Sequence, residues 1–433
     1  MEFVHENSTL TGRHELDLFN NAPTSASLQE GIYVEHSPTT SLNDSSPIQF
    51  TVSGDSAYYL DLSSSYLYLE AKVVKGNGGD LDADAPIRVV NLLAHSLFQQ
   101  VDIYLNEVLV SSASSLYHYR SMLETLLSFN TEAKESQLTM SLFSKDTAGA
   151  MDALDAANKG FTDRQTYTAK SQTIPLIGRI HADIFSQKRF MLNGVDMKVR
   201  LIRNPNKLVV MGAADSTHKI SITQASLYVR KVKINKGIQM RHIEKLEKLN
   251  MALYPITRVD MKSYNLAQGS LAWNEENLFT GILPKRIVVA LVDADAFNGA
   301  YNKNPFNFKH HNLSYCSLLV DGKMNPQKPL ISDFGNHSSL RNYFTLFEST
   351  GRIFENEGLD ISRLEYEQGY TIIGWDLTPD RENSGTFNLI KKGDIRIELK
   401  FSQALANPVN LIVYSEFDSC IKIDKNRSVL SPY

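Results

Sequence analysis

Cysteine is scarce in this chain, which has only Cys316 and Cys420 among its 433 residues. Two cysteines cannot build a disulfide framework or a thiolate zinc site, so both are excluded. Each cysteine is interpreted as a small buried hydrophobic residue rather than as a nucleophile, because free thiols usually pack like apolar side chains. Tryptophan is equally rare, with two residues against 19 tyrosines and 20 phenylalanines, a composition that favours strands.

Long apolar runs and a strong charge bias are also missing. No apolar run approaches the roughly 20 residues that a helix needs to cross a bilayer. The first residues, 1–6, are too acidic for a secretory signal peptide. The net charge of −4 does not indicate a nucleic-acid or membrane partner. We therefore expect the protein to be made and folded in the cytosol or nucleus.

The usual motifs of catalysis are absent as well. The sequence contains no G-x-S-x-G elbow, P-loop, H-E-x-x-H pair or Rossmann glycine set. The run Gly-Asn-Gly-Gly at 76–79 is interpreted as a turn, because no helix pattern begins there to complete a phosphate cradle. We predict no catalytic, cofactor-binding or metal-binding residues, and we do not expect an enzyme.

An acidic run is the first candidate for a metal site. Asp80, Asp82 and Asp84 alternate like the start of an EF-hand, whose oxygen ligands bind calcium. The sixth position of that loop requires glycine and the twelfth glutamate, whereas this chain has Ala85 and Asn91. A solvated acidic loop is therefore the preferred interpretation.

Further aspartate and histidine candidates are weak for geometric reasons. Asp293 and Asp295 form a D-x-D at the end of a predicted strand, where aspartates usually cap turns rather than bind a metal. His310 and His311 are neighbours, and neighbours on a strand point to opposite faces, so they cannot easily share a metal ion. His181 lies opposite apolar neighbours in a strand pattern and is interpreted as structural.

A strand that occurs twice organises the chain. Residues 193–201, Asn-Gly-Val-Asp-Met-Lys-Val-Arg-Leu, reappear in altered form at 392–399, Lys-Gly-Asp-Ile-Arg-Ile-Glu-Leu. In both copies apolar and charged residues then alternate, which is typical of a half-buried strand. The repetition predicts one β module present twice.

A second repeated pattern supports the duplication. A strand at 101–106 leads through a short strand at 108–110 to a helix at 116–129, and a strand at 316–320 leads through a turn to a helix at 340–348. Ser115 and Ser339 precede these helices as candidate N-caps. Each helix carries an apolar stripe, made of Leu116, Tyr119, Leu123, Leu126 and Leu127 in the first and of Leu340, Tyr343, Phe344 and Phe347 in the second.

The length of the chain exceeds the usual limit for a single core, so a duplicated unit fits better. Many short strands separated by turns predict an all-β protein, a double jelly roll of two eight-stranded antiparallel β-sandwiches with short helices in the loops. The predicted strands are 48–52, 66–74, 173–177, 180–185, 195–203, 220–234, 256–264, 287–292, 314–320, 361–367, 369–375, 395–401 and 409–417. The predicted divisions are an N-terminal arm (1–46), a first jelly roll (47–240) with a surface excursion at 130–170 that is helix-prone at 148–157, a helical connector (241–250), a second jelly roll (251–424) and a C-terminal tail (425–433).

Charge is unevenly distributed along these divisions. The arm has Arg13 against seven acidic residues, a net charge of −6, so we expect it to be mobile in the free subunit and to contact protein rather than a genome. A basic cluster within 230–248 could face packaged DNA, but we favour a solvated face that pairs with acidic neighbours. The cluster consists of Arg230, Lys231, Lys233, Lys236, Arg241, Lys245 and Lys248, beside Glu244 and Glu247.

Three stretches of the first half resemble the major capsid proteins of Polinton/Maverick elements and adintoviruses. One is the opening block with 15–19 (ELDLF), 33–35 and 47–50, and another is 96–106 (SLFQQVDIYLN) with 119–120 and 123–127. The third is 176–185 (LIGRIHADIF) with 192–196 and 200–203. The second half matches mainly in the order of its elements, so its assignment depends on the internal repeat.

The resemblance implies a double jelly-roll coat protein related to adenovirus hexon and tectivirus coats. In such families three chains form a pseudo-hexameric capsomer that tiles an icosahedral shell, since three copies of a two-module chain present six similar lobes. It implies self-association as a homotrimer and then a trimer lattice, penton and minor capsid proteins as partners, and at most an indirect contact with packaged double-stranded DNA. The implied location is the virion, after synthesis in the host cytoplasm and assembly in the nucleus.

A different class of function stays open as an alternative. The chain could be a carbohydrate- or other ligand-binding β-sandwich, including a copy of the element retained by a host. Such proteins display aromatic and acidic residues together on one sheet or loop set, whereas tyrosine and phenylalanine here are spread through the strand patterns. The oligomeric mass and electron micrographs of the purified protein distinguish the two hypotheses.

Overall fold

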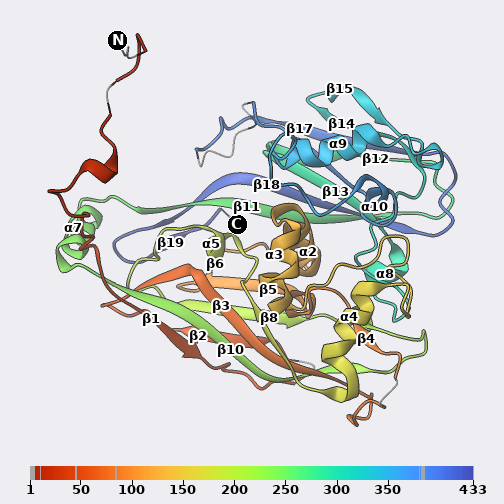
Figure 1. The fold of residues 1–433 in the computed structure, drawn as a ribbon, viewed down its shortest axis with the longest axis horizontal. Helices are drawn as coiled ribbons and strands as arrows, with labels where there is room; N and C mark the ends of the chain where they lie inside the picture. Colours follow the sequence, from red (N-terminus) through yellow and green to blue (C-terminus); the bar gives the residue numbers. More distant parts are fainter. Residues whose placement is uncertain are drawn as a thin grey trace.

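The computed structural model describes residues 5–9, 11–43, 46–82, 85–379, 381 and 386–432. Two β-sandwiches make up the body of the protein, one above the other in Figure 1, and the N-terminal segment leaves the body at one end. Within the described ranges, no helix is both long and apolar enough to cross a membrane.

The first sandwich contains two four-stranded antiparallel sheets with the orders β1-β10-β3-β7 and β2-β8-β5-β6. A short pair, β4 with β9, lies beside them. The bounds are β1 Leu28–His36, β2 Ile48–Val52, β3 Tyr59–Val74, β4 Arg88–Val89, β5 Phe98–Leu105, β6 Val108–Leu109, β7 Ile174–Gly178, β8 Met197–Arg203, β9 Val210–Met211 and β10 Lys219–Ile234.

The second sandwich has the sheet orders β11-β18-β13-β16, with β19 on β18, and β12-β17-β14-β15. The bounds are β11 Ala252–Leu266, β12 Ala272–Ile282, β13 Arg286–Asp293, β14 Leu313–Val320, β15 Lys323–Ile331, β16 Ile372–Asp376, β17 Lys392–Phe401, β18 Val409–Ile423 and β19 Val429–Leu430. When the eight main strands of each half are ranked along the chain, both halves have the orders 1-8-3-6 and 2-7-4-5. This shared connectivity confirms the predicted double jelly roll.

The repeated strand lies in the same place in both halves. β8 is the inner strand between β2 and β5, and β17 is the inner strand between β12 and β14. The apolar positions of β8, such as Met197 and Val199, are buried, and so are Ile395 and Ile397 of β17. The alternation in sequence therefore selected the face that enters the core, as predicted.

Short helices connect the strands, and two of them match the predicted helices closely. α2 follows the β5–β6 hairpin and α9 follows the β14–β15 hairpin. The bounds are α1 Leu93–Ser96, α2 Tyr117–Ser128, α3 Thr131–Glu135, α4 Lys159–Thr168, α5 Asp183–Ser186, α6 Asn206–Val209, α7 Lys236–Glu247, α8 Ala294–Asn298, α9 Leu340–Ser349 and α10 Arg363–Glu367, with 3-10 turns η1 His14–Leu16, η2 Gln137–Ser141, η3 Ala169–Ser171 and η4 Phe334–Asn336.

Several local predictions are wrong. The predicted strands 180–185 and 361–367 contain the helices α5 and α10 instead. At α10 the Ser362 hydroxyl accepts from the Glu365 backbone N–H and the Glu365 carboxylate accepts from the Ser362 N–H, a capping box that outweighs the alternating pattern. The helix-prone run 148–157 forms turns, and the helix begins only after Asn158, whose side chain accepts from the Phe161 N–H. Strands β12 and β15 had no counterpart among the predicted strands.

The N-terminal segment and α7 form one end of the molecule (Figure 1). Within the predicted arm, β1 pairs with β10 along its length, from Leu28 opposite Ile234 to His36 opposite Leu227. The residues before β1 run past α7 and away from the body. α7 joins β10 to β11, and the predicted pair on it is present, with Lys248 Nζ 2.6 Å from Glu244 Oε1.

Candidate functional site

The acidic run near 80 is engaged by lysines of the neighbouring strand end. Lys75 Nζ lies 2.8 Å from Asp82 Oδ1, and Lys72 Nζ lies 3.9 Å from Asp80 Oδ1. Both aspartate side chains are largely exposed, and Asp84 lies outside the described residues. The described part of this loop is thus a solvated set of ion pairs.

Asp293 is bound by lysine and histidine side chains of the chain itself. Its Oδ2 lies 2.7 Å from Lys309 Nζ, and its Oδ1 lies 3.6 Å from His311 Nε2. Burial raises the pKa of Asp293, but the hydrogen bond and charge of Lys309 outweigh burial and lower it. His310 stacks on Phe334 with ring centroids 4.1 Å apart, and the two histidines lie in a turn before β14 rather than on a strand. Asp295 lies in α8, and no group of three metal-ligating side chains occurs in the described part of the chain.

His181 belongs to a buried polar network rather than to a strand. Its Nδ1 lies 2.6 Å from Glu124 Oε2 on α2, and Glu124 Oε1 accepts from Arg120 Nε at 2.8 Å. Arg120 also donates to Asp183 at 2.6 Å, and Asp183 in turn accepts from the Val259 N–H of β11 at 3.4 Å. The network therefore joins the first sandwich to the second.

Electrostatics explains why this network holds charge inside the protein. Burial raises the pKa of Glu124, but the charge of Arg120 and the hydrogen bond of His181 outweigh burial and bring it to about 2. Burial lowers the pKa of His95, whose ring meets that of His181 edge-on with centroids 4.6 Å apart. Cys316 is fully buried, and burial raises the pKa of its thiol. The charged groups are held by internal partners and the thiol is enclosed in the core, which fits a structural role.

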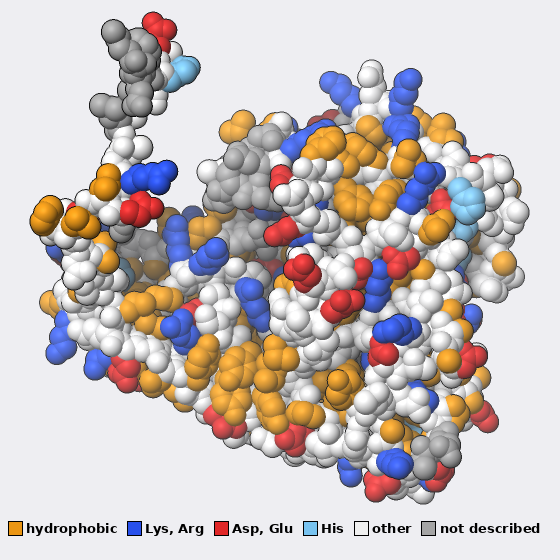
Figure 2. All heavy atoms as spheres, viewed as in Figure 1, with side chains coloured by type: hydrophobic (Ala, Val, Ile, Leu, Met, Phe, Trp, Pro, Cys, Tyr) orange, Lys and Arg blue, Asp and Glu red, His pale blue; other side chains and the backbone are white. Residues whose placement is uncertain are grey.

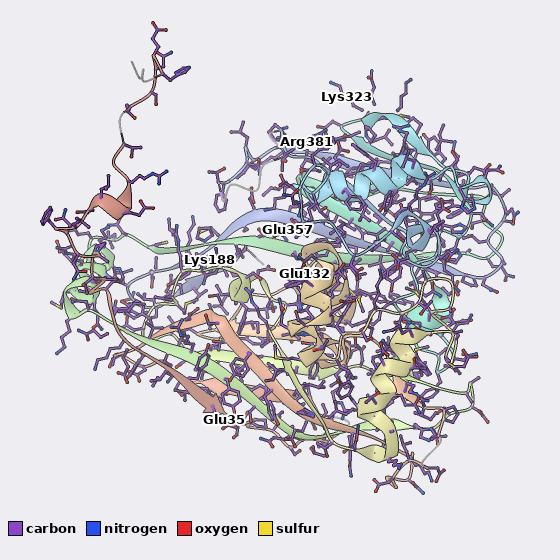
Figure 3. The ribbon with its side chains drawn as sticks, viewed as in Figure 1. Glu35, Glu132, Lys188, Lys323, Glu357 and Arg381 are labelled. Carbon is purple, nitrogen blue, oxygen red and sulfur yellow. The ribbon has the colours of Figure 1, made fainter. Side chains whose placement is uncertain are left out.

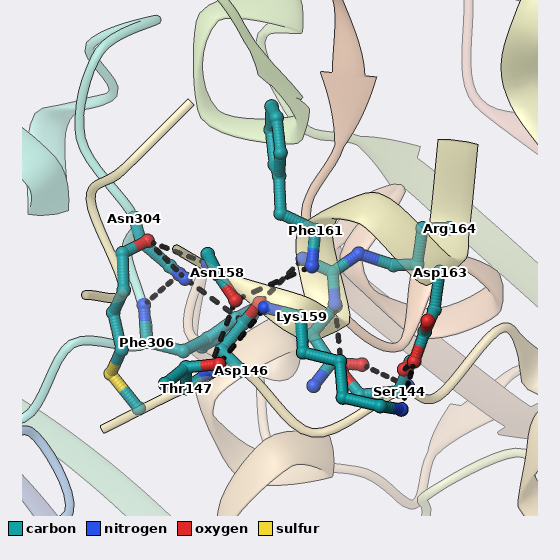
Figure 4. A network of polar contacts seen from close by, with 12 residues as sticks. Ser144, Asp146, Thr147, Asn158, Lys159, Phe161, Asp163, Arg164, Asn304 and Phe306 are labelled. Atoms are coloured by element: carbon teal, nitrogen blue, oxygen red, sulfur yellow. Dashed lines mark hydrogen bonds and ion pairs between the residues drawn. The ribbon is translucent and has the colours of Figure 1, made fainter. Parts of the chain in front are cut away.

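A second network connects the two sandwiches through the predicted excursion (Figure 4). Arg164 on α4 is fully buried and its Nη2 lies 2.7 Å from Asp146 Oδ1. The other carboxylate oxygen of Asp146 accepts from Asn304 Nδ2 at 3.0 Å, and the Asp146 carbonyl accepts from the Tyr370 hydroxyl at 2.7 Å. Asn304 and Tyr370 belong to the second half of the chain. Part of the excursion predicted on the surface, including Asp146 and Arg164, is therefore buried, while much of the rest, such as 131–140, is exposed as predicted.

The same junction has an aromatic part. Tyr119 on α2 is completely buried and lies parallel to Phe297 of the second half, with ring centroids 5.6 Å apart and planes 9° apart. It meets Phe306 edge-on at 5.9 Å. In Figure 1, α2 lies between the two sandwiches. The predicted apolar stripe of α2 is thus covered, in part by the other half of the same chain.

The equivalent helix α9 is covered only in part. Of its stripe residues, Tyr343 and Phe347 are half-buried against the core, whereas Leu340 and Phe344 are 55% and 42% exposed. The fully buried residues of α9 are Asn342, Thr345, Leu346 and Ser349. Their face of the helix rests on β16, where a side chain at Gly374 would collide with Ser349. Figure 2 shows hydrophobic side chains gathered over α9 near the top of the view. We call Leu340, Phe344 and Leu364 of the neighbouring α10 the α9 patch.

The two candidate N-cap serines bind elsewhere. The Ser339 hydroxyl donates to Glu367 Oε1 at 2.6 Å, and the Ser115 hydroxyl donates to Gln100 Oε1 at 3.4 Å. The prediction that these hydroxyls cap the helices is wrong, because side chains of the sandwich compete for them.

Part of the basic cluster has acidic neighbours. Glu30 of β1 is paired directly with Lys233 of β10, so the two share a face of the sheet, whereas Lys231 lies opposite the apolar Ile32. Arg230 Nη1 lies 2.7 Å from Asp61 Oδ2, and Lys248 pairs with Glu244 on α7. These contacts favour the solvated face over a DNA-binding surface.

Sequence reasoning missed the junction residues Asp146, Arg164 and Asn304. Their partners are remote along the chain, so no local motif marks them. The one available signal was an arginine and aspartates in a segment that also contains Phe143, Met151 and Phe161, all buried in the structure. Apolar residues of that size argue against a fully solvated loop.

Comparison with known proteins was made by sequence and by structure. No family model matches the chain. An uncharacterized protein of Caenorhabditis elegans is 25% identical over 396 residues, covering 88% of this chain and 92% of that protein.

The structural similarities cover almost the whole chain. A chain of the Sputnik virophage structure aligns with a TM-score of 0.66 and 14% identity, covering 98% of this chain and 92% of its own. A chain of the PBCV-1 virus capsid gives 0.60 and 9%, with 96% and 99% coverage. The mavirus major capsid protein gives 0.51 and 10%, with 99% and 96% coverage. The chain thus has the double jelly-roll fold found in viral major capsid proteins.

Proposed function

We propose that this chain is a major capsid protein, a structural subunit that forms homotrimeric, pseudo-hexameric capsomers of an icosahedral virus or virus-like transposon particle. The two lobes that each chain contributes are the predicted jelly rolls 47–240 and 251–424, the first extended by strand β1 of the predicted arm, so three chains present six. A catalytic role is not part of the proposal. The fold supports it, since the similar structures come from virus particles and include a major capsid protein.

The α9 patch is the observation that carries the trimer. α2 and α9 occupy equivalent places in two equivalent sandwiches, and α2 is covered by the second sandwich of its own chain. A ring of three chains sets each second sandwich against the first sandwich of the next chain. That neighbour covers the α9 patch, which in the single chain is exposed.

The source proposed is a Polinton/Maverick element or an adintovirus. The resemblance of three stretches in the first half supports this lineage, and a relative in Caenorhabditis elegans fits an element carried by animals. Penton and minor capsid proteins of the same element are the further partners. The proposed location is the virion, with synthesis in the host cytoplasm, assembly in the nucleus and only an indirect contact with packaged DNA.

The mass of the purified protein tests the proposal. Light scattering should give three times the mass of the chain and should keep that value on dilution to low micromolar concentration. Trimer interfaces of obligate size, on the order of 2,000 Å² or more, do not dissociate in this range. Electron microscopy should show shells at higher concentration or with a penton partner.

A clean monomer without particles would contradict the capsid function. That result would favour the alternative, a ligand- or carbohydrate-binding β-sandwich, including a copy retained by a host. Screening the monomer against glycans would then be the next experiment.

A further inference from the structure

A groove of about 680 Å³ lies at the end of the molecule where the first sandwich passes into the second. Its walls come from the start of β1, from α7, from the start of β11 and from residues 188–192. The lining is mainly apolar, with Ile234, Leu246 and Tyr254 buried behind the more exposed Leu28 and Leu253. The volume falls within the roughly 300–1,000 Å³ of pockets that hold a compact ligand.

Basic side chains form the rim of this groove. Lys188, Arg189 and Lys245 line it and are exposed, and Lys188 is labelled in Figure 3. His242 adds a polar contact on the same wall, with its Nδ1 3.1 Å from the Tyr59 hydroxyl. An apolar floor with a positive rim matches a segment that carries apolar anchors and carboxylates together.

One described segment of the chain has this chemistry. Leu16, Leu18 and Phe19 are 75%, 76% and 97% exposed, so these anchors are almost fully in solvent. Glu15 and Asp17 alternate with them, within an arm of net charge −6. Three neighbouring large apolar side chains exposed to this degree are typical of a binding segment.

We propose that the groove binds residues 15–19 of a second copy of this chain. The inference deepens the proposed function, on which it rests for the presence of neighbouring copies. Within one chain the arm passes α7 and stands away from the body (Figure 1), and Leu28 of the same arm already forms part of the groove wall. Docking within one chain would require residues 20–27 to reverse direction fully, whereas the arm of a neighbour can enter from outside.

Thiol cross-linking of full-length chains tests this exchange. In a Cys420→Ser background, which leaves only the fully buried Cys316, one chain carries Asn20→Cys and a second, differently tagged chain carries Asn250→Cys on the groove wall. The two chains are co-expressed so that they enter the same oligomers, the purified protein is treated with a short bis-maleimide, and the two-tag product is measured on a denaturing gel. The matched control replaces Asn250→Cys with Lys323→Cys, an exposed site on the tip of the β14–β15 hairpin in the second sandwich (Figure 3).

The expected yield for the groove pair is at least tenfold above the Lys323 control. Leu18→Ser with Phe19→Ser in the arm, or Lys188→Glu with Lys245→Glu on the rim, should each reduce the yield at least tenfold. Equal yields for the groove and control pairs would overturn the proposal. A third chain carries Asn20→Cys and Asn250→Cys together, and a cross-link that forms only inside this chain and never between the two tagged chains would also overturn the proposal.

The mass of the same samples separates this inference from the proposed function. Trimers that persist while the groove pair gives only the control yield would reject the arm exchange and leave the capsid function standing. A specific cross-link between chains that do not form trimers would support the exchange and reject the capsomer. Because Cys420 is only half-buried and the other substituted positions are exposed, the variants should retain the mass and melting temperature of the unmodified chain.

Discussion

The helices α2 and α9 occupy the same place in two sandwiches of identical strand order, yet only α2 buries its whole predicted apolar stripe. α2 buries its large apolar stripe, including Tyr119, against the core and the other sandwich. α9 buries Leu346 together with the polar Asn342, Thr345 and Ser349, and it exposes Leu340 and Phe344. Two equivalent surfaces thus differ in that only the one on α2 is covered by the other sandwich of the same chain.

A chain of two linked lobes contains one lobe-to-lobe contact and leaves the equivalent outer surfaces uncovered. The contact inside the chain is reinforced by the Arg164–Asp146 pair and by the Arg120–Glu124–His181 network. The outer surface of α9 instead has exposed hydrophobic residues, which suit association with another chain. The comparison predicts that substitutions near α2 lower the free energy of unfolding, whereas substitutions in the α9 patch weaken the association of chains.

The largest expected effect is at Tyr119. Tyr119→Ala removes a fully buried ring between the two halves and should lower the free energy of unfolding by about 4 kcal/mol. Phe344→Ala on the exposed face of α9 should change it by less than about 0.5 kcal/mol. Urea unfolding of both variants, at concentrations where each is monomeric, measures the difference. Similar losses for the two would remove the contrast between the helices.

The ion pair at the junction should show the next largest effect. Asp146→Asn leaves the buried Arg164 without its charged partner and should cost about 3 kcal/mol. The matched control is Asp163→Asn, on the helix α4 that also carries Arg164. Its partner Lys159 is largely exposed, so this substitution should cost less than about 0.5 kcal/mol. Thermal unfolding of the two variants compares them. Equal shifts in Tm would mean that the buried Arg164–Asp146 pair contributes no more to stability than the exposed Lys159–Asp163 pair.

The buried histidine of α2 should make the junction sensitive to acid. Burial lowers the pKa of His118 to about 3, below its ordinary value of 6.5. The unfolded chain then binds the proton more tightly, so stability is complete above pH 6.5 and is lost as the pH falls towards 3. The free energy of unfolding of His118→Gln relative to wild type should therefore be roughly 2 to 3 kcal/mol more favourable at pH 4.5 than at pH 7.5.

Denaturant titrations of wild type and variant at pH 4.5, 7.5 and 8 measure this difference. Wild type and variant should differ by the same amount at pH 7.5 and at pH 8, because the side chain is neutral there in both states. If wild type and His118→Gln lose the same free energy of unfolding between pH 6.5 and 4.5, His118 is not the cause of the acid sensitivity.

The smallest expected effect concerns association through the α9 patch. Phe344→Ser should weaken trimer formation at least tenfold, or about 1.4 kcal/mol, because an apolar contact with the neighbouring chain is lost. Light scattering over a dilution series gives the midpoint of dissociation. The control is Thr350→Ser. Thr350 is half-buried and directly follows α9, so its substitution should leave the midpoint unchanged. A trimer insensitive to Phe344→Ser would show that another surface forms the interface.

The strands of both halves could largely be predicted because their cause is local. In β8 and β17 each apolar side chain alternates with a charged one, and this period places one face in the core wherever the strand lies. The errors were also local in origin. At 361–367 the alternation suggested a strand, but the hydrogen bonds between Ser362 and Glu365 stabilise a helix.

The sequence by itself determined the duplicated all-β architecture, since alternation and the repeated strand–hairpin–helix order need no remote partner. It could not determine which side of α9 enters the core, because the stripe of Leu340 and Phe344 looks equivalent to that of α2. Only the tertiary structure decided this, through Gly374, which lets the small residues of α9 lie close against β16. It also decided the burial of Arg164, because Asp146 becomes its partner only when the excursion folds back between the two sandwiches.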